Sequence, residues 1–184
     1  MQIAEKKKLE NYSSDIENLN LSRTDFLGII DLVRFTKINK LDIFGNYINQ
    51  IINLNNKCRE LNCSRNMLKN LDKMPKKLKI LNCSQNLLTN IDNLPLGINK
   101  LDCSYNLIKN LDYLPEGIEE LNCSYNIITN LDNLPTGLKK LYCGMNKILD
   151  LSNLPNKLVR LNCYSYPVII LNNLPKTLKY IKNS

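Results

Sequence analysis

A period of 20 residues runs through the sequence from about Ile38 onward, without insertion or deletion. Self-similarity at this length is typical of proteins built by stacking one small unit. A single unit cannot fold alone, because ordering 20 residues costs ~1–2 kcal/mol of backbone entropy per residue. Burial of about six apolar side chains per unit stabilises it by only ~1.5–3 kcal/mol per side chain. Stacked units share their apolar faces, so the sequence predicts a solenoid with one continuous core.

Three ladders of identical residues mark the period. Alternation, as in Leu121-Asn-Cys123, places leucine and cysteine on one face of a short strand and the polar residue on the other. One such strand per unit predicts a parallel sheet. The leucine ladder comprises Leu41, Leu61, Leu81, Leu101, Leu121, Leu141 and Leu161. The cysteine ladder comprises Cys63, Cys83, Cys103, Cys123, Cys143 and Cys163. The asparagine ladder comprises Asn46, Asn66, Asn86, Asn106, Asn126 and Asn146.

Written as one line, the unit is L-x-x-L-x-C-x-x-N-x-L-x-x-L-x-x-L-P-x-x. This pattern resembles the leucine-rich repeat signature over about four-fifths of the chain. The resemblance implies a curved parallel sheet on the concave face of the solenoid, with extended or turn-like segments on the convex face. The Leu-Pro ending resembles the repeats of bacterial effectors delivered into host cells. The Asn-, Lys- and Ile-rich composition resembles repeat proteins of giant DNA viruses and their amoebal hosts.

The two flanks depart from the period. We expect residues 1–36 to form an N-terminal cap, with Leu19-Asn-Leu21 as a candidate degenerate first strand. Residues 25–35 carry apolar side chains at helical spacing, which predicts a short helix in this cap. Residues 37–184 then hold about seven repeats. Tyr166-Pro167 replaces the usual pair of an asparagine and a variable residue, and the pattern stops at residues 178–181 without a visible cap, which favours weak self-association through this end.

Composition excludes several classes of function. The chain has no histidine, so mechanisms that need an imidazole base or ligand are excluded. The cysteines form a linear file that does not converge as a zinc site requires, and we interpret them as small buried hydrophobes. We therefore predict no metal, no cofactor and no catalytic residues. No apolar run is long enough to span a membrane, and no secretory signal opens the chain. We expect a reducing, cytoplasmic compartment, which is the host's if the chain is an effector or viral protein.

The asparagine ladder is interpreted as structural, because buried amides must be satisfied by backbone groups of neighbouring turns. The candidate site lies instead on the concave face, where the outward strand positions vary between repeats. Tyr, Arg and Met are enriched at protein interfaces, and they gather in the C-terminal half of this face. The predicted partner-binding residues are Arg65, Tyr105, Tyr125, Lys140, Tyr142, Met145, Arg160 and Tyr164.

These observations predict a non-catalytic module that binds a protein partner through its concave face. The net charge of +8 leaves nucleic-acid or other polyanion binding as an alternative. That alternative is disfavoured because lysine and glutamate alternate along the predicted strand openings. A second alternative is an adaptor in a ubiquitin-ligase-type assembly, although residues 1–36 are short for an F-box. The effectors that the chain resembles carry a catalytic ligase domain after the repeats, and we expect none in these 184 residues.

Overall fold

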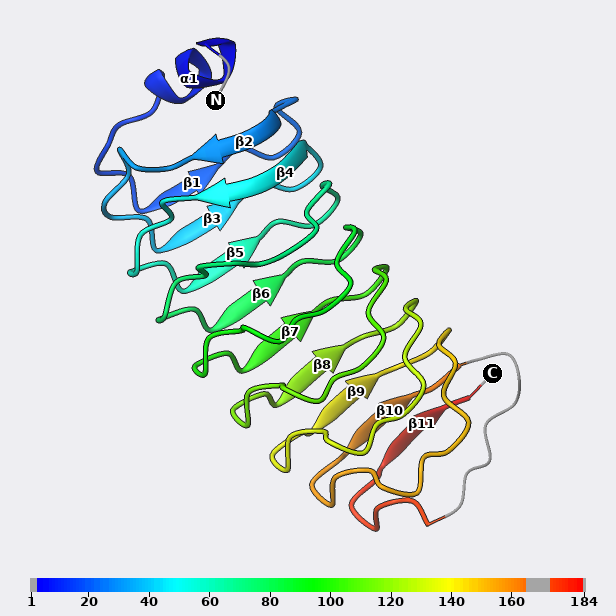
Figure 1. Ribbon diagram of the computed structural model, residues 1–184. Coiled ribbons are helices and arrows are strands. Elements are labelled where there is room, and N and C mark those ends of the chain that lie inside the picture. The colour runs from blue at the N-terminus through cyan, green and yellow to red at the C-terminus, as the bar shows by residue number, and fades with distance from the viewer. Residues whose placement is uncertain (1–2, 165–172, 184) are drawn as a thin grey trace.

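A computed structural model describes residues 3–164 and 173–183 of the protein. It contains a parallel sheet in which nine strands follow one another in the order β1-β3-β5-β6-β7-β8-β9-β10-β11 (Figure 1). The strands are β1 (Asn18–Asn20), β3 (Lys40–Asp42), β5 (Glu60–Asn62), β6 (Ile80–Asn82), β7 (Lys100–Asp102), β8 (Glu120–Asn122), β9 (Lys140–Tyr142), β10 (Arg160–Asn162) and β11 (Tyr180–Lys182).

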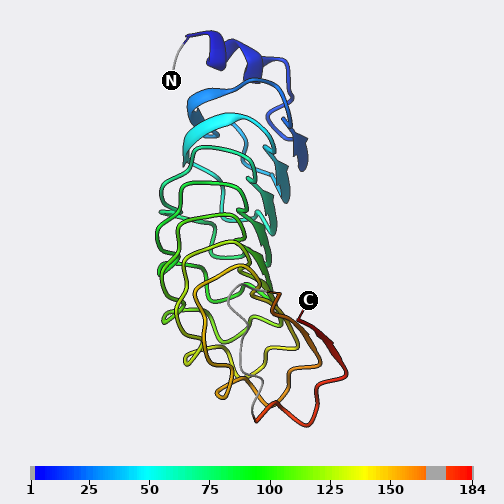
Figure 2. The ribbon, with the colours of Figure 1, turned by 90° about the vertical axis from the view of Figure 1, so that its right-hand side faces the viewer.

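The sequence period sets the register of the sheet. Leu121 of β8 pairs with Leu141 of β9, and the same 20-residue offset relates neighbours from β3 to β11. The first coil is longer, since Leu19 of β1 pairs with Leu41 of β3 at an offset of 22 residues. The strands line the inner side of a curved solenoid, as Figure 2 shows. The prediction of a solenoid with its parallel sheet on the concave face is confirmed.

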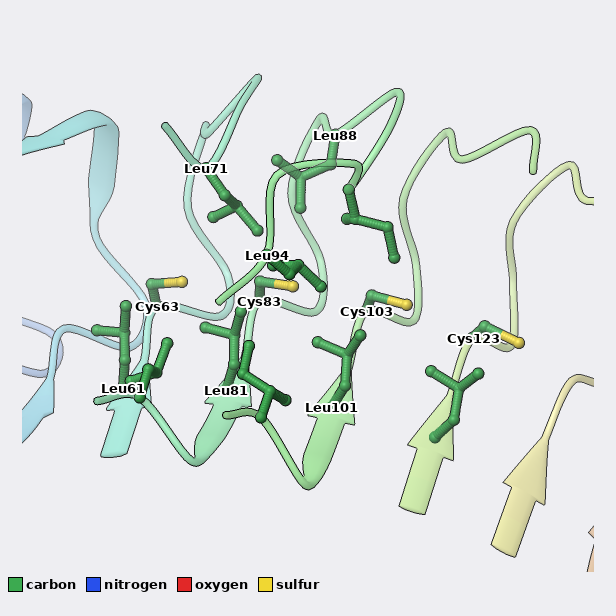
Figure 3. Packing of buried hydrophobic residues seen from close by; sticks show 14 of the residues in the cluster. Leu61, Cys63, Leu71, Leu81, Cys83, Leu88, Leu94, Leu101, Cys103 and Cys123 are labelled. Carbon is green, nitrogen blue, oxygen red and sulfur yellow. The ribbon is translucent and has the colours of Figure 1, made fainter. Parts of the chain in front are cut away.

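The core lies behind this sheet and runs along the solenoid. In β3 and in β5 to β10 the central leucine points inward, and so does the residue two positions later, which is Ile43 after β3 and a cysteine after the others. These side chains repeat from coil to coil (Figure 3). Leucines and isoleucines of the convex segments, such as Leu71, Leu88 and Leu94, close the core from the opposite side. Each coil therefore buries its apolar side chains against the coils before and after it.

The convex side changes character along the chain. Its first two coils contain the strands β2 (Leu27–Asp31) and β4 (Tyr47–Ile52), which pair in parallel as a separate sheet. Later coils carry turns at the same place. Gln50 and Ile52 of β4 correspond to asparagine and aspartate in the following coils, for example Asn70 and Asp72. Asparagine and aspartate favour turns and are depleted in strands, which explains why the convex strands stop after β4.

The helix predicted over residues 25–35 is wrong, because this segment contains β2. Its apolar residues fit helical spacing, but β2 pairs with β4 of the next coil, and that contact overrides the local pattern. The only helix among the described residues is α1 (Ile3–Glu10). It lies over the N-terminal end of the solenoid (Figure 1). The fully buried Leu9 joins the core there, and Arg34 donates hydrogen bonds from Nη1 and Nη2 to the carbonyls of Leu9 and Tyr12 at 3.0 and 3.1 Å.

The two ends of the sheet differ. Residues 18–20 form the first strand, so the segment before residue 37 contributes to the same sheet; the domain division at that point stays a prediction. At the other end, Ile181 of β11 is 45% exposed, whereas its neighbour Leu161 in β10 is 1% exposed. Tyr166-Pro167, which the sequence singled out, lies outside the described residues. Self-association through this end stays a prediction.

Candidate functional site

The concave surface is formed by the first and third residues of the strands. In β3 and in β5 to β10 the central leucine is buried, the first residue is exposed or half-buried, and the third is half-buried. In a strand, successive side chains alternate between faces, so these two positions point away from the core. The surface is therefore held in register by the backbone ladder and by the core behind it.

The strand-opening residues, which are the first residues of β3 and of β5 to β10, are charged except at Ile80, and lysine and glutamate are neighbours at several places along the line. Lys40 and Glu60 form an ion pair at 3.0 Å, and Glu120 lies 3.0 Å from Lys100 and 3.2 Å from Lys140. Partial burial raises the pKa of Glu120, but its hydrogen bonds and charge attraction to the two lysines outweigh this and leave the pKa below its ordinary value. Such surface pairs contribute only ~0–1 kcal/mol each to stability. They do neutralise the central part of the face.

A second line of side chains lies three residues beyond each strand. We call it the stacked file, and it consists of Arg65, Gln85, Tyr105, Tyr125 and Met145. These residues share a left-handed backbone conformation, with φ between 53° and 56°. The rings of Tyr105 and Tyr125 stack with centroids 4.0 Å apart and planes 9° apart. Both remain largely exposed, at 46% and 41%. The 20-residue offset thus produces an aromatic pair that is ordered yet accessible.

The N-terminal part of the stacked file is cationic. Arg65 donates a hydrogen bond from Nε to Oε1 of Gln85 at 2.6 Å. Its guanidinium also lies 5.5 Å from the centroid of the Phe44 ring, and the guanidinium of Arg23 lies 5.2 Å from the centroid of the same ring. Cation–π contacts at exposed sites contribute ~0.5–1 kcal/mol each. Arg65 is therefore held near Phe44 and Gln85, two coils before Tyr105, the first residue of the tyrosine pair.

The predicted partner-binding residues all belong to the concave side, but they do not form one cluster. Arg65, Tyr105, Tyr125 and Met145 belong to the stacked file, whereas Lys140 and Arg160 open strands β9 and β10. Tyr142 and Tyr164 lie between these two lines, where Tyr142 is half-buried and Tyr164 exposed.

Sequence reasoning missed two residues and one hollow at the C-terminal end. Tyr180 and Lys182 of β11 continue the lines of Arg160 and Asn162, so the 20-residue period would have found them. A hollow of about 340 Å³ lies beside the tyrosine pair. It is lined by Ser124, Tyr125, Gly144, Met145, Asn162, Tyr164 and Lys182. Gly144 occupies the position that serine holds in the four preceding coils. This departure from the repeat was the sequence signal that could have indicated the hollow.

The cysteine ladder lies inside the core, away from this surface. Its thiols and that of Cys58 are fully buried and unpaired, and the thiol of Cys83 donates to the carbonyl of Asp102 in the next coil at 3.4 Å. Burial raises the pKa of Cys63 to about 12 and that of Cys58 to about 11. Thiols with raised pKa values carry little thiolate at neutral pH and are poor nucleophiles. Within the described residues, no three side chains of His, Cys, Asp or Glu gather as a metal site would require.

The asparagine ladder completes the backbone hydrogen bonding of the turns. Nδ2 of Asn106 donates to the carbonyls of Cys83, Cys103 and Ser104, each at 3.1 Å. Its Oδ1 accepts the N–H of Leu88 from the preceding coil at 3.0 Å. One amide therefore serves two coils, as buried polar groups require. These asparagines are buried and do not contribute to the concave surface.

Comparison with solved structures shows which known fold this chain has. No protein-family model matches the sequence, and no curated protein matches it. Among solved structures, the leucine-rich repeat domain of a Shigella effector aligns over 86% of this chain and 72% of its own, with 24% identity and a TM-score of 0.70. The chain has the leucine-rich repeat fold. Internalin C2 from Listeria monocytogenes aligns over 92% and 81% of the two chains, with 22% identity and a TM-score of 0.80.

A third solved structure also includes a cysteine ladder. The functional domain of InlJ from Listeria monocytogenes includes a cysteine ladder. It aligns over 92% of this chain and 46% of its own, with 26% identity and a TM-score of 0.62. The resemblance to bacterial repeat domains is confirmed at the level of fold, and the resemblance to viral repeat proteins stays a prediction. Across residues 3–164 and 173–183, no helix has the length and apolar character needed to cross a membrane.

Proposed function

We propose that this chain is a non-catalytic interaction module that binds a protein partner through its concave face. The observation that carries the proposal is the exposed, stacked pair of Tyr105 and Tyr125. Tyrosine supplies a large contact area with few rotatable bonds, and it is enriched among the residues that dominate binding energy at interfaces. Met145 and Tyr142 extend the same surface toward β9.

Backbone conformation supports a role outside folding for these tyrosines. The left-handed region costs a residue with a side chain ~1–2 kcal/mol, and glycine occupies it without this cost. Gly45 shows that glycine fits this place in the coil, with φ of 65°. Tyr105 and Tyr125 are therefore not required by the turn, and their exposure means that they are not required by the core.

The rigidity of the surface also favours binding. Each strand is fixed by its neighbours, and the central leucines are anchored in the core. A surface that is ordered before binding loses little conformational entropy when a partner docks. Polyanion binding along the whole face is less favourable, because Asp42, Glu60, Asp102 and Glu120 are interspersed with the cations.

The proposal is tested by affinity capture from host-like cytosol with three forms of the chain. We expect the wild type to retain a partner and the Tyr105→Ala/Tyr125→Ala/Tyr142→Ala variant to lose it, with binding weakened by more than ~2 kcal/mol. Loss of the aromatic stack should change the free energy of unfolding by only ~0.5–1.5 kcal/mol. The control is the convex variant Lys76→Ala/Lys77→Ala, which should bind as the wild type does. Loss of binding in the convex variant alone would contradict the proposal.

A further inference from the structure

The positive charge of the chain is concentrated at its C-terminal end. From Lys139 onward the sequence contains eight lysines and arginines and one acidic residue, Asp150. The remainder of the chain is nearly balanced, so this segment supplies seven of the eight net charges. Asp150 lies on a convex turn, where its Oδ1 accepts a hydrogen bond from the N–H of Ser152. The concave ends of β9, β10 and β11 therefore carry cations and no carboxylate.

Two of these cations face the concave side with their charge uncompensated. Arg160 opens β10, and its guanidinium lies 5.0 Å from the ring of Tyr180 on β11. Lys182 ends β11 and lines the hollow beside Tyr125. Within the described part of the chain, neither cation forms an ion pair, whereas Lys140 on β9 shares Glu120 with a second lysine. The unpaired charges therefore lie beyond the last carboxylate of the face.

The hollow beside Tyr125, to which Lys182 contributes, is lined by both apolar and polar groups. Tyr125, Met145 and Tyr164 contribute aromatic and thioether surface, and Asn162 and Lys182 contribute polar groups. With a volume of about 340 Å³, the hollow has room for a large side chain. An apolar cavity with a few polar groups at its border orients a bound group and sets specificity.

We propose that this end of the concave face receives an acidic, extended segment of the protein partner. The segment places a carboxylate against Arg160 and Lys182 and an aromatic or aliphatic side chain in the hollow against Tyr125 and Met145. Charge complementarity identifies the occupant, because arginine and lysine at one end attract carboxylates and exclude basic sequences. This inference rests on the proposed function of the concave face and adds the chemistry of its partner.

A peptide fits this arrangement better than a nucleic acid. A nucleic-acid strand carries one phosphate per ~3.4 Å and would extend beyond the two cations along the face. It would then meet Glu120 and Asp102, which lie on the strands before the hollow. A short acidic peptide places its charge at one end only. The observations therefore favour a protein segment, and an oligonucleotide becomes the competing probe in the test.

The test is fluorescence anisotropy with the full chain and three labelled probes. The first is a peptide of about eight residues that contains several glutamates and two phenylalanines; the second has the glutamates replaced by glutamine; the third is an oligothymidylate of equal charge. We expect the acidic peptide to bind at least tenfold more tightly than both other probes. The Arg160→Gln/Lys182→Gln variant should lose at least tenfold of this affinity, and Met145→Ala should lose severalfold.

The control is Lys76→Gln/Lys77→Gln, which removes the same charge from the convex side and should change the affinity less than twofold. Thermal melting checks that each variant folds; if Arg160→Gln does not, Lys182→Gln alone carries the test. Equal binding of the acidic and amide peptides, equal effects of the two charge variants, or tighter binding of the oligonucleotide would overturn the inference. If these results overturn it while the tyrosine variant still loses its captured partner, the concave-face function stands and only the partner's chemistry is wrong.

Discussion

The cysteines show how one residue type can fit a repeated position. In the fold, this place faces the core, and cysteine fills it as a small apolar side chain. The thiol adds a weak hydrogen bond to the next coil, as Cys63 does with the carbonyl of Asn82 at 3.5 Å. Because these thiols are buried, they stay protonated in the native state at pH values where an unfolded chain loses its protons.

This difference makes stability sensitive to alkaline pH. The unfolded chain releases thiol protons near the ordinary pKa of about 9, whereas burial raises the pKa of Cys63 to about 12. The unfolded state therefore binds fewer protons in this window, and the free energy of unfolding falls as pH rises, by up to ~1.4 kcal/mol per pH unit for each thiol. Cys63→Ala should reduce this slope by that amount in urea titrations above about pH 9. An unchanged slope, or rapid labelling of Cys63 in the native protein, would contradict the buried assignment.

At the scale of single elements, the turn after β9 differs from the turns before it. Gly144 stands where Ser64, Ser84, Ser104 and Ser124 stand in the earlier coils. A Cβ atom at Gly144 would lie 2.5 Å from the carbonyl oxygen of Tyr164. The following turn therefore approaches closely here, and glycine permits this approach.

Gly144→Ser restores the serine of the repeat pattern, but the close approach of Tyr164 means that it should destabilise the fold. We expect Gly144→Ser to lower the free energy of unfolding by ~1–3 kcal/mol, because the backbone of Tyr164 has to move to admit the side chain. The control is Gly137→Ser, since a Cβ atom there would lie 3.7 Å from the carbonyl oxygen of Glu116, an ordinary contact. Chemical denaturation of the two variants provides the comparison. A stable Gly144→Ser and an unstable Gly137→Ser would refute this account of the turn.

The sequence predicts the elements that follow from the 20-residue period. It does not predict those whose structure depends on contacts between backbone segments that are far apart in the chain. Leu121 in β8 and Cys123 directly after it fix the face and the register of this strand. The order of the sheet and the alignment of Tyr105 with Tyr125 therefore follow from the 20-residue period. The helix expected over residues 25–35 was wrong because pairing between β2 and β4 depends on two coils together. The hollow beside Tyr125 was not predicted because it depends on where the backbone of Tyr164 lies.

At the scale of the whole molecule, the solenoid separates the side chains that hold its coils together from those that are accessible on its concave face. The core and the asparagine ladder hold successive coils together, while the concave side chains contact one another and solvent. Concave side chains can therefore differ between coils without loss of the fold, as the variation along the stacked file shows. We therefore expect the partner to contact the concave face at the tyrosine pair.

Site-specific photocrosslinking tests this claim most directly. A benzophenone amino acid replaces either Tyr105 on the concave side or Tyr113, a tyrosine on a convex turn that is 70% exposed. Both positions present an exposed aromatic side chain of the same chain, so they differ in the face that they report. The account predicts that the partner retained by the wild type crosslinks from position 105 and not from position 113. Crosslinking from position 113 alone, or equally from both, would contradict it.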